Sequence, residues 1–207
     1  MTKPPIPLNM RFRGYLPVII DIETAGFNPK KNALLEIAAV IVEFNGNAEL
    51  EITERYSTHV IPFKNAELDE AALKFNGIDP HHPFRMAIEE KEALHMLFNP
   101  IKHAVKRNNC TRAILVGHNP AFDINFLNAA IQRTQIKRSP FHPFSTFDTA
   151  TLGGLAYQQT VLAKIAQAAG LDWDNEKAHS ALYDAEKTAE LFCMIVNRWK
   201  QLESLAN

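Results

Sequence analysis

Four carboxylates and one histidine, carried by three short segments, have the types and spacing to do chemistry together. Asp21 and Glu23 lie in VIIDIETAGF, Asp123 lies in VGHNPAFD, and His179 and Asp184 lie in AHSALYDAE. Hard divalent cations prefer carboxylate oxygens, and imidazole exchanges protons near neutral pH. If the fold brings the segments together, they could hold two cations beside one proton carrier, the equipment for cleaving phosphodiester bonds.

The first segment places two acids at the end of a buried strand. Residues 16–20 (LPVII) form a short apolar run, and the turn-forming residues 25–29 (AGFNP) follow the acids. Side chains two residues apart in a strand point to the same side, so Asp21 and Glu23 face one way. Like charges this close repel one another unless a cation or a proton intervenes. The alternative is a strand that simply ends in solvated acids.

The second segment repeats this arrangement with a helix. Residues 113–117 (AILVG) predict another buried strand, after which Asn119 is a candidate N-cap and Pro120 a candidate first helical residue. Asp123 would then lie in the first turn, where an acid can also serve only to complement the helix dipole. We expect His118 to be a hydrogen-bonding residue at the strand end.

The third segment opens a long amphipathic helix. Apolar residues recur near the helical period from Leu182 to Trp199. Asp184 falls in the first turns of this helix, and His179 lies just before or at its start. The alternative for His179 is a surface histidine at a helix start.

The order DIETAG, HNPAFD and HSALYD resembles the three motifs of the DEDDh family, the 3′→5′ exonucleases of the ribonuclease H-like superfamily. The resemblance to one tRNA-trimming branch of that family covers nearly the whole chain. The segments that carry it are RFRGYLPVIIDIETAGFNP, ALLEIAAV, FNGIDP, KRSPFHPFSTFDTATL and AHSALYDAEKTAELFCMIVNRWK. It implies an α/β, ribonuclease H-like fold with a mixed five-stranded sheet flanked by helices.

The resemblance also implies roles for the motif residues. Asp21, Glu23 and Asp184 would hold two Mg²⁺ ions, with Mn²⁺ a plausible substitute, and Asp123 would complete the shell through water. His179 would deprotonate the attacking water and could itself approach a metal. The implied activity is that of an exoribonuclease releasing nucleoside 5′-monophosphates from the 3′ ends of tRNA and small stable RNAs, and from single-stranded DNA.

Aromatic residues near the motifs are candidates for base stacking, which holds single-stranded ends with little sequence preference. The candidates are Phe27, Phe75, Phe122 and Phe144. The first and third adjoin the motifs, whereas the other two lie in segments that resemble base-stacking positions of the family. The alternative is that these rings belong to the core. The family places a base-contacting Glu where this chain has Ala71, next to Glu70, which leaves the base preference open.

Basic side chains are candidates for binding RNA, although the net charge is −1. Local clusters, not the total charge, bind phosphates. The clusters are Arg11 and Arg13; Lys102, Lys106, Arg107 and Arg112; and Arg133, Lys137 and Arg138. The resemblance implies a homodimer in which the basic patch of one subunit feeds RNA into the active site of the other. The alternative is that each cluster is a solvated face.

Length and composition predict one globular domain. The chain has 207 residues, 46% hydrophobic and 22% charged, which suits one exonuclease domain over residues 11–207 after a flexible tail of residues 1–10. Cys110 and Cys193 form neither a metal-binding spacing nor a disulfide framework. Without a signal peptide or a long apolar run, this predicts a cytoplasmic protein with no membrane association.

The hydrophobic pattern predicts alternating elements after an initial group of three strands. The expected strands are 16–23, 34–44, 52–61, 112–117 and 145–148, and the expected helices are 67–76, 84–107, 120–134, 160–169 and 180–203. Asn45-Gly46 predicts a hairpin turn between the second and third strands.

Two rival functions remain open on the sequence alone. One is another DEDDh exonuclease, such as a polymerase proofreading subunit or an oligoribonuclease, which its preferred substrate would reveal. The other is a nucleic-acid-binding module with an inactive site, which the intact set of motif residues disfavours.

Overall fold

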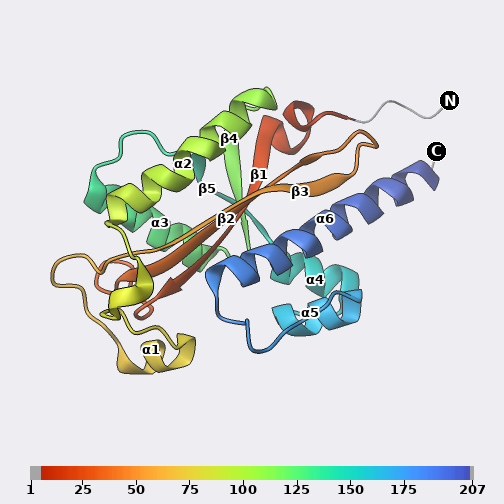
Figure 1. Ribbon diagram of the computed structural model, residues 1–207. Helices are drawn as coiled ribbons and strands as arrows, with labels where there is room; N and C mark the ends of the chain where they lie inside the picture. Colours follow the sequence, from red (N-terminus) through yellow and green to blue (C-terminus); the bar gives the residue numbers. More distant parts are fainter. Residues whose placement is uncertain (1–5, 206–207) are drawn as a thin grey trace.

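The computed structural model describes residues 6–205 and places a mixed five-stranded sheet at the centre of the molecule (Figure 1). The strands are β1 (Tyr15–Thr24), β2 (Leu34–Phe44), β3 (Leu50–His59), β4 (Arg112–Gly117) and β5 (Phe141–Asp148). Their order is β3-β2-β1-β4-β5, with β1 to β3 antiparallel and β4 and β5 parallel to β1. The predicted α/β fold with a mixed sheet flanked by helices is confirmed.

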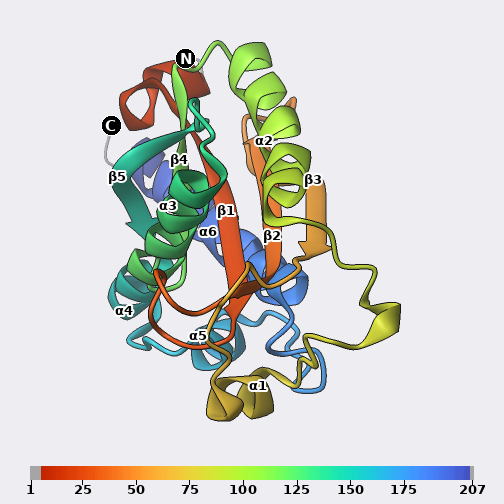
Figure 2. The same ribbon diagram turned by 90° about the vertical axis from the view of Figure 1, so that its left-hand side faces the viewer.

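Helices cover both faces of this sheet. They are α1 (Glu70–Asn76), α2 (Glu90–Arg107), α3 (Ala121–Thr134), α4 (Thr149–Tyr157), α5 (Leu162–Ala169) and α6 (Ala181–Leu205). Helices α2 and α3 lie on one face, whereas α6 crosses β1, β2 and β3 on the other (Figures 1 and 2). None of the described helices has the length and apolar character needed to cross a membrane.

The central strand β1 is apolar because helices cover it from both sides. Leu16, Val18, Ile19 and Ile20 are each at most 1% exposed, which is the continuous pattern expected of a strand buried on both faces. The charged side chains of β1, Asp21 and Glu23, both lie near the carboxyl end of the strand.

The hairpin predicted at Asn45-Gly46 is confirmed, as a loop of residues 45–49 between β2 and β3. The Asn45 amide donates to the Glu49 carbonyl oxygen at 2.9 Å. The Asn45 side-chain oxygen accepts from the Asn47 and Glu49 amides at 2.9 and 3.1 Å. One asparagine side chain thus organises the whole turn.

Helix α6 is tied to this hairpin near its carboxyl end. The Asn197 side chain exchanges hydrogen bonds of 2.8 and 3.0 Å with the backbone of Leu50. The Lys200 ammonium donates to the carbonyl oxygens of Ala48 and Asn47 at 2.8 and 3.2 Å. The last turns of α6 are therefore held against the loop that joins β2 to β3.

Two expected elements differ from the structure, and one helix was not expected. The expected helix 84–107 begins only at Glu90, because the preceding segment forms a 3-10 turn, Pro83–Arg85, that ends at Met86 with a φ of 52°. Strand β5 begins at Phe141, earlier than expected. Helix α4 was not expected, since it contains Gly153 and Gly154, which are poor helix formers; a Cβ at Gly153 would lie 2.3 Å from the Ile165 side chain.

The start of α3 also differs from the expectation. The N-cap is Pro120 and the first helical residue is Ala121, with no capping hydrogen bond from a side chain. Asn119 instead takes the left-handed region (φ 62°), and its amide donates to the Asp148 carboxylate at 3.0 Å. The capping role predicted for Asn119 is therefore wrong.

Part of the expected N-terminal tail of residues 1–10 falls within the described residues. Leu8–Met10 form a 3-10 turn, and Leu8 is buried in the hydrophobic core. Residues 1–5 lie outside the described part of the chain.

Candidate active site

The carboxyl end of β1 presents Asp21 and Glu23 on one side of the sheet. Ile20 and Ile22, which alternate with them, are 1% and 6% exposed, while both acids are only partly buried. Both acids lie in the part of β1 that pairs with β2, opposite Ala38 and Glu36, so the sheet supports their backbone.

Asp123 enters the same region from the first turn of α3. It is 5% exposed, and its carboxylate accepts a hydrogen bond from the Ile22 backbone. A Cβ at Gly117, the last residue of β4, would lie 3.4 Å from an Asp123 carboxylate oxygen. The small residue at the strand end therefore lets α3 bring its acid close to β1.

His179 and Asp184 come from the start of α6. The His179 amide donates to the Asp184 carboxylate at 3.1 Å, and His179 takes the left-handed region with a φ of 66°. Potential ligand atoms of Glu23, His179 and Asp184 all lie within 4.8 Å of one another. The other Asp184 carboxylate oxygen is buried without a hydrogen-bond partner.

Burial and mutual repulsion dominate the electrostatics of Asp21 and Glu23. Burial raises the pKa of Asp21 well above its usual value, and the charges of Asp123 and Asp184 raise it further. Burial and the charges of Asp184 and Glu36 raise the pKa of Glu23 to about 8, against a hydrogen bond from Asn76.

The remaining two carboxylates follow the same pattern. Burial raises the pKa of Asp123 to about 7 and raises that of Asp184, in each case against backbone hydrogen bonds that favour the charged form. Groups that are buried, crowded and acidic become fully ionised most readily when a cation replaces the missing protons. The donor set and the unpaired Asp184 oxygen fit a hard divalent cation.

A cavity of about 350 Å³ adjoins the carboxylates. Its lining includes Glu23, Phe27, Ala71, Phe75 and Phe122. The Phe27 and Phe122 ring centroids lie 6.1 Å apart in an edge-on arrangement. The cavity is therefore an aromatic slot that opens beside the acids.

The exposure of the four candidate rings distinguishes slot from core. Phe27 and Phe75 are 84% and 70% exposed, so neither is a core residue. Phe122 is partly buried and packs against the core residue Phe126, with ring centroids 4.9 Å apart. Phe144 is exposed but does not line the cavity; its ring lies against His142.

The basic candidates gather at the other end of the sheet. Lys102, Arg112, Lys137 and Arg138 line a second cavity of about 710 Å³. Arg112 begins β4, whereas Gly117, beside Asp123, ends it, so roughly 17 Å of strand separates the two regions. The basic cavity and the carboxylates therefore do not form one continuous site.

Other basic candidates have different surroundings. Arg11 lies over the Phe12 and Phe44 rings, Arg13 lies over the Tyr15 ring, and Lys106 is exposed on α2.

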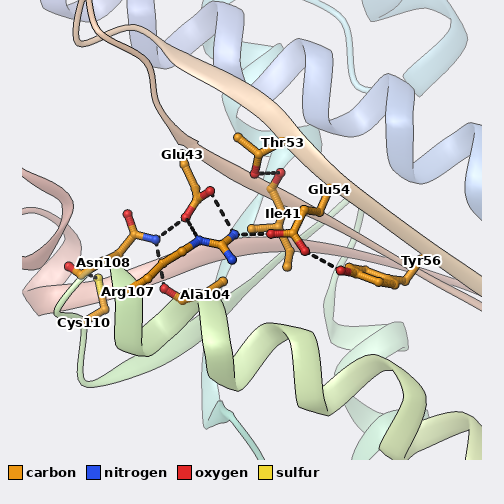
Figure 3. Close-up of polar contacts among 9 residues, drawn as sticks. All are labelled: Ile41, Glu43, Thr53, Glu54, Tyr56, Ala104, Arg107, Asn108 and Cys110. Carbon is orange, nitrogen blue, oxygen red and sulfur yellow. Dashed lines mark hydrogen bonds and ion pairs between the residues drawn. The ribbon is translucent and has the colours of Figure 1, made fainter.

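Two basic candidates are committed to ion pairs. Arg107 makes hydrogen bonds of 2.8 and 2.9 Å to the Glu43 carboxylate and also bonds Glu54, as Figure 3 shows. Arg133 pairs with the buried Glu90 at 2.6 and 3.1 Å. Both are therefore poor candidates for binding phosphate, which corrects the expectation.

His118 has the structural role that the sequence predicted. Its ring nitrogens contact the Thr149 hydroxyl at 3.1 Å and the Thr160 carbonyl oxygen at 2.9 Å. Both nitrogens are occupied, so His118 ties β4 to the α4–α5 region.

Two polar residues beside the acids were not predicted. Asn76 donates to the Thr24 carbonyl oxygen at 3.0 Å and hydrogen-bonds the Glu23 carboxylate. Glu36 of β2 lies directly opposite Glu23 and is 8% exposed. A single charged residue within the apolar run LLEIAAV was the one available sign of Glu36.

The site combines a cluster of acids and one histidine at the carboxyl end of a central strand with an aromatic slot beside them. This arrangement is typical of metal-dependent nucleases.

Comparison with known proteins agrees with this class. A family model described as "Exonuclease" matches residues 18–192. Ribonuclease T of Hahella chejuensis is 58% identical over 200 residues, covering 97% of this chain and 92% of that protein. Ribonuclease T of Marinobacter nauticus is 56% identical, covering 97% and 90%.

Solved structures agree on the fold. Exonuclease I of E. coli in complex with a dT13 oligonucleotide has a TM-score of 0.68 at 16% identity. The match covers 92% of this chain and 43% of that one, so this chain spans less than half of exonuclease I. The nuclease domain of 3′hExo, a DEDDh family member bound to rAMP, has a TM-score of 0.64 at 21% identity and coverage of 87% and 90%. These matches confirm the ribonuclease H-like fold.

The chain therefore belongs to the exonuclease family that includes the ribonuclease T proteins. It is a 3′→5′ exonuclease of the exoribonuclease type, and members of this family depend on divalent metal ions.

Proposed function

We propose that this protein trims the 3′ ends of tRNA and other small stable RNAs, releasing nucleoside 5′-monophosphates, and that single-stranded DNA is a second substrate. The observation that carries the proposal is the cluster of acids and His179 beside an aromatic slot. The identity of 56–58% to ribonuclease T proteins supports the choice of RNA.

Asp21, Glu23 and Asp184 would hold two Mg²⁺ ions, with Asp123 completing the site through water. Their mutual repulsion and the unpaired Asp184 oxygen support this assignment. When bound, the ions supply positive charge for the attacking and leaving oxygens of the scissile phosphate.

His179 would act as the general base. Its ring is exposed, and it lies within reach of Glu23 and Asp184, so it borders the place where the phosphate must sit. It would take the proton from the attacking water, which is the step that limits hydrolysis by neutral water. The hydrogen bond from its amide to Asp184 supports a defined position for the imidazole.

Phe27, Phe75 and Phe122 would stack on the terminal bases. Exposed rings around a cavity of about 350 Å³ can hold a base by its face without a hydrogen-bond code. Phe144 lies outside that cavity and would contact RNA elsewhere. The lining residue Ala71 offers no polar atom in its side chain, which supports weak discrimination among bases at that wall.

Basic residues far from the acids would serve a second subunit in a homodimer. Lys137 and Arg138 lie with Arg112 on the cavity at the opposite end of the sheet, and Lys106 is exposed on α2. Since roughly 17 Å of β4 separates that region from the acids of the same chain, a partner's active site is a suitable destination for RNA held there. Arg11 and Arg13 would extend this surface.

Incubation of the protein with Mg²⁺ and tRNA labelled at its 5′ end, followed by sizing of the products, tests the proposal. Stepwise shortening of the 3′ overhang up to the acceptor stem is the expected result. Preference for oligomers of a few nucleotides, or for mismatched primer ends, would favour the rival exonucleases. Binding without cleavage would contradict an active site, and sedimentation of the same sample would test the homodimer.

A further inference from the structure

Glu36 is a buried carboxylate that the proposed reaction does not use directly. It lies in β2 opposite Glu23 of β1 and His59 of β3, and it is 8% exposed. Side chains directly opposite on neighbouring antiparallel strands share one face of the sheet. Glu36 therefore lies in the same row as Glu23, one strand farther from the centre. A carboxylate this buried requires partners.

The partners of Glu36 come from the start of α6 and from one arginine. The Ser180 hydroxyl and the backbone amides of Ala181 and Leu182 hydrogen-bond its carboxylate. Burial raises the pKa of Glu36, and the charge of Arg85 and these hydrogen bonds oppose the rise. Hydrogen bonds of 2.7 and 3.3 Å fix the Arg85 guanidinium to the Leu35 and Pro80 carbonyl oxygens. The start of α6 and the Arg85 guanidinium thus both contribute to holding this carboxylate.

His59 contributes less to this cluster. Its Nδ1 lies 3.9 Å from a Glu36 carboxylate oxygen and has no hydrogen-bond partner. Burial, followed by the charge of Arg85, lowers the pKa of His59, so the imidazole is neutral at pH 7. The cation that accompanies Glu36 is therefore Arg85.

The amides that Glu36 binds are among those that a helix leaves without partners. Ala181 and Leu182 are the first two residues of α6, and the first four N–H groups of a helix have no intrahelical acceptor. A carboxylate at this end satisfies them and complements the helix dipole. The acceptor here comes from a neighbouring strand, so it connects the helix start to the sheet.

This connection borders the proposed general base. His179 directly precedes Ser180, and its left-handed backbone is unfavourable for a residue with a side chain. On one side, its amide is held by Asp184 at 3.1 Å. On the other side, the chain continues directly into the residues that Glu36 binds.

We propose that Glu36 is a positioning residue: by binding the first turn of α6 from β2, it fixes His179 relative to Glu23. The inference rests on the proposed role of His179 as the general base. In this role Glu36 touches neither the substrate nor the reacting atoms, because it acts through the start of α6.

Glu36→Ala and Glu36→Gln test the proposal on a short single-stranded oligonucleotide. Glu36→Ala should lower kcat about 10- to 100-fold, the usual scale for groups that orient ligands, with KM little changed. Glu36→Gln keeps an oxygen that accepts amide hydrogen bonds, so it should recover most of kcat. The glutamine variant also allows the amide exchange and the metal requirement to be measured if the alanine variant folds poorly.

Glu43→Gln is the matched control, because Glu43 is a partly buried glutamate near the other end of β2. It is expected to lower thermal stability without changing kcat. Hydrogen exchange gives a readout that is independent of turnover. The amides of Ala181 and Leu182 should exchange faster in Glu36→Ala, and their rates should stay near wild type in Glu43→Gln.

The double variant Glu36→Ala/His179→Ala separates positioning from an independent role. If Glu36 acts through His179, the double variant should be as slow as His179→Ala alone, because effects within one unit are not additive. Additive losses, or a tenfold higher metal requirement in Glu36→Gln, would overturn the proposal in favour of a ligand role. Normal kcat together with normal amide exchange in Glu36→Ala would overturn the proposed role of Glu36 and leave the proposed role of His179 intact. Full activity of His179→Ala would overturn both this inference and the proposed base.

Discussion

Two clusters of acids near opposite ends of the sheet have opposite electrostatics. At one end, Glu43 and Glu54 surround Arg107 (Figure 3). Burial alone would raise the pKa of Glu43, but hydrogen bonds from Arg107 and Asn108 outweigh it, so the pKa is lowered. At the other end, burial and like charges raise the pKa of both Asp21 and Glu23.

The difference lies in where the compensating charge comes from. The Arg107 cluster is complete within the protein, and it stabilises the fold by joining β2, β3 and α2. At Asp21 and Glu23, by contrast, no lysine or arginine of the described residues offsets the burial and the like charges that raise the pKa. A site that the protein leaves uncompensated in this way costs stability and gains the ability to bind a metal ion and a phosphate.

The largest expected effect comes from removing one charge at the uncompensated end. Asp21→Asn should abolish turnover, because a carboxylate proposed to hold metal is lost. In chelator it should raise stability by about 0.5–2 kcal/mol, because it relieves repulsion. Turnover with Mg²⁺ and thermal melting with chelator measure the two effects. Full activity of the wild type in excess chelator would contradict the metal-dependent mechanism.

The next effect concerns the proton carrier. His179→Ala should fold normally and bind metal nearly as well, but lose roughly 10²- to 10⁴-fold in rate, the scale for a positioned general base. Raising the pH should restore part of the rate, because hydroxide replaces the base. Near wild-type turnover at pH 7 would instead leave His179 as a residue that only begins a helix.

The pH dependence of stability should differ between the two ends. Glu23 has an ordinary pKa of 4.5 that rises to about 8 in the fold. The folded state then holds a proton that the unfolded state releases, so stability present below pH 4.5 is lost as the pH rises towards about 8. The loss can reach about 1.4 kcal/mol per pH unit for each such carboxylate.

Denaturant melts from pH 4.5 to 8, with chelator and with Mg²⁺, measure this dependence. Mg²⁺ should flatten the loss, since a cation replaces the protons. Glu43 should behave in the opposite sense. Its pKa is lowered from the ordinary value of 4.5, so it adds stability that is present above pH 4.5 and is lost as the pH falls below that value. A chelated protein whose stability does not fall over this interval would contradict the proposed repulsion.

Removing the internal cation should affect the fold but not the chemistry. Arg107→Ala leaves Glu43 and Glu54 close together without their cation, and it should reduce the free energy of unfolding by about 1–3 kcal/mol. Turnover of a short oligonucleotide should stay at the wild-type level below the melting temperature. A loss of kcat in the folded variant would show that the two ends are coupled.

The smallest expected effect is on the slot beside the acids. Phe27→Ala should weaken terminal-base binding by ~1–3 kcal/mol, without lowering the melting temperature, because the ring is 84% exposed. On a hairpin RNA, the variant should stop farther from the stem, leaving a longer overhang. An unstable variant with an unchanged stop position would show that the ring packs instead of stacking.

The motif acids could be predicted from sequence because each stands at the end of a periodic element. Apolar strands and turn residues locate Asp21 and Asp123 by local pattern alone. Glu36 could not be assigned in this way, since its partners lie more than a hundred residues later in α6. The expectation for Arg107 was wrong for the same reason. An arginine in a basic cluster indicates phosphate binding, but the guanidinium of Arg107 is engaged by Glu43, which lies 64 residues away in sequence.

The two anchored ends of α6 constrain how this chain can change its length. The amino end of the helix meets β2 through Glu36, and Asn197 near the other end meets the β2–β3 loop. One residue inserted between them would rotate one end by about 100° relative to the other. Substitutions on the exposed side of α6 are therefore tolerable, whereas insertions and deletions between Asp184 and Asn197 are not. Length variation among homologues should fall in surface loops instead.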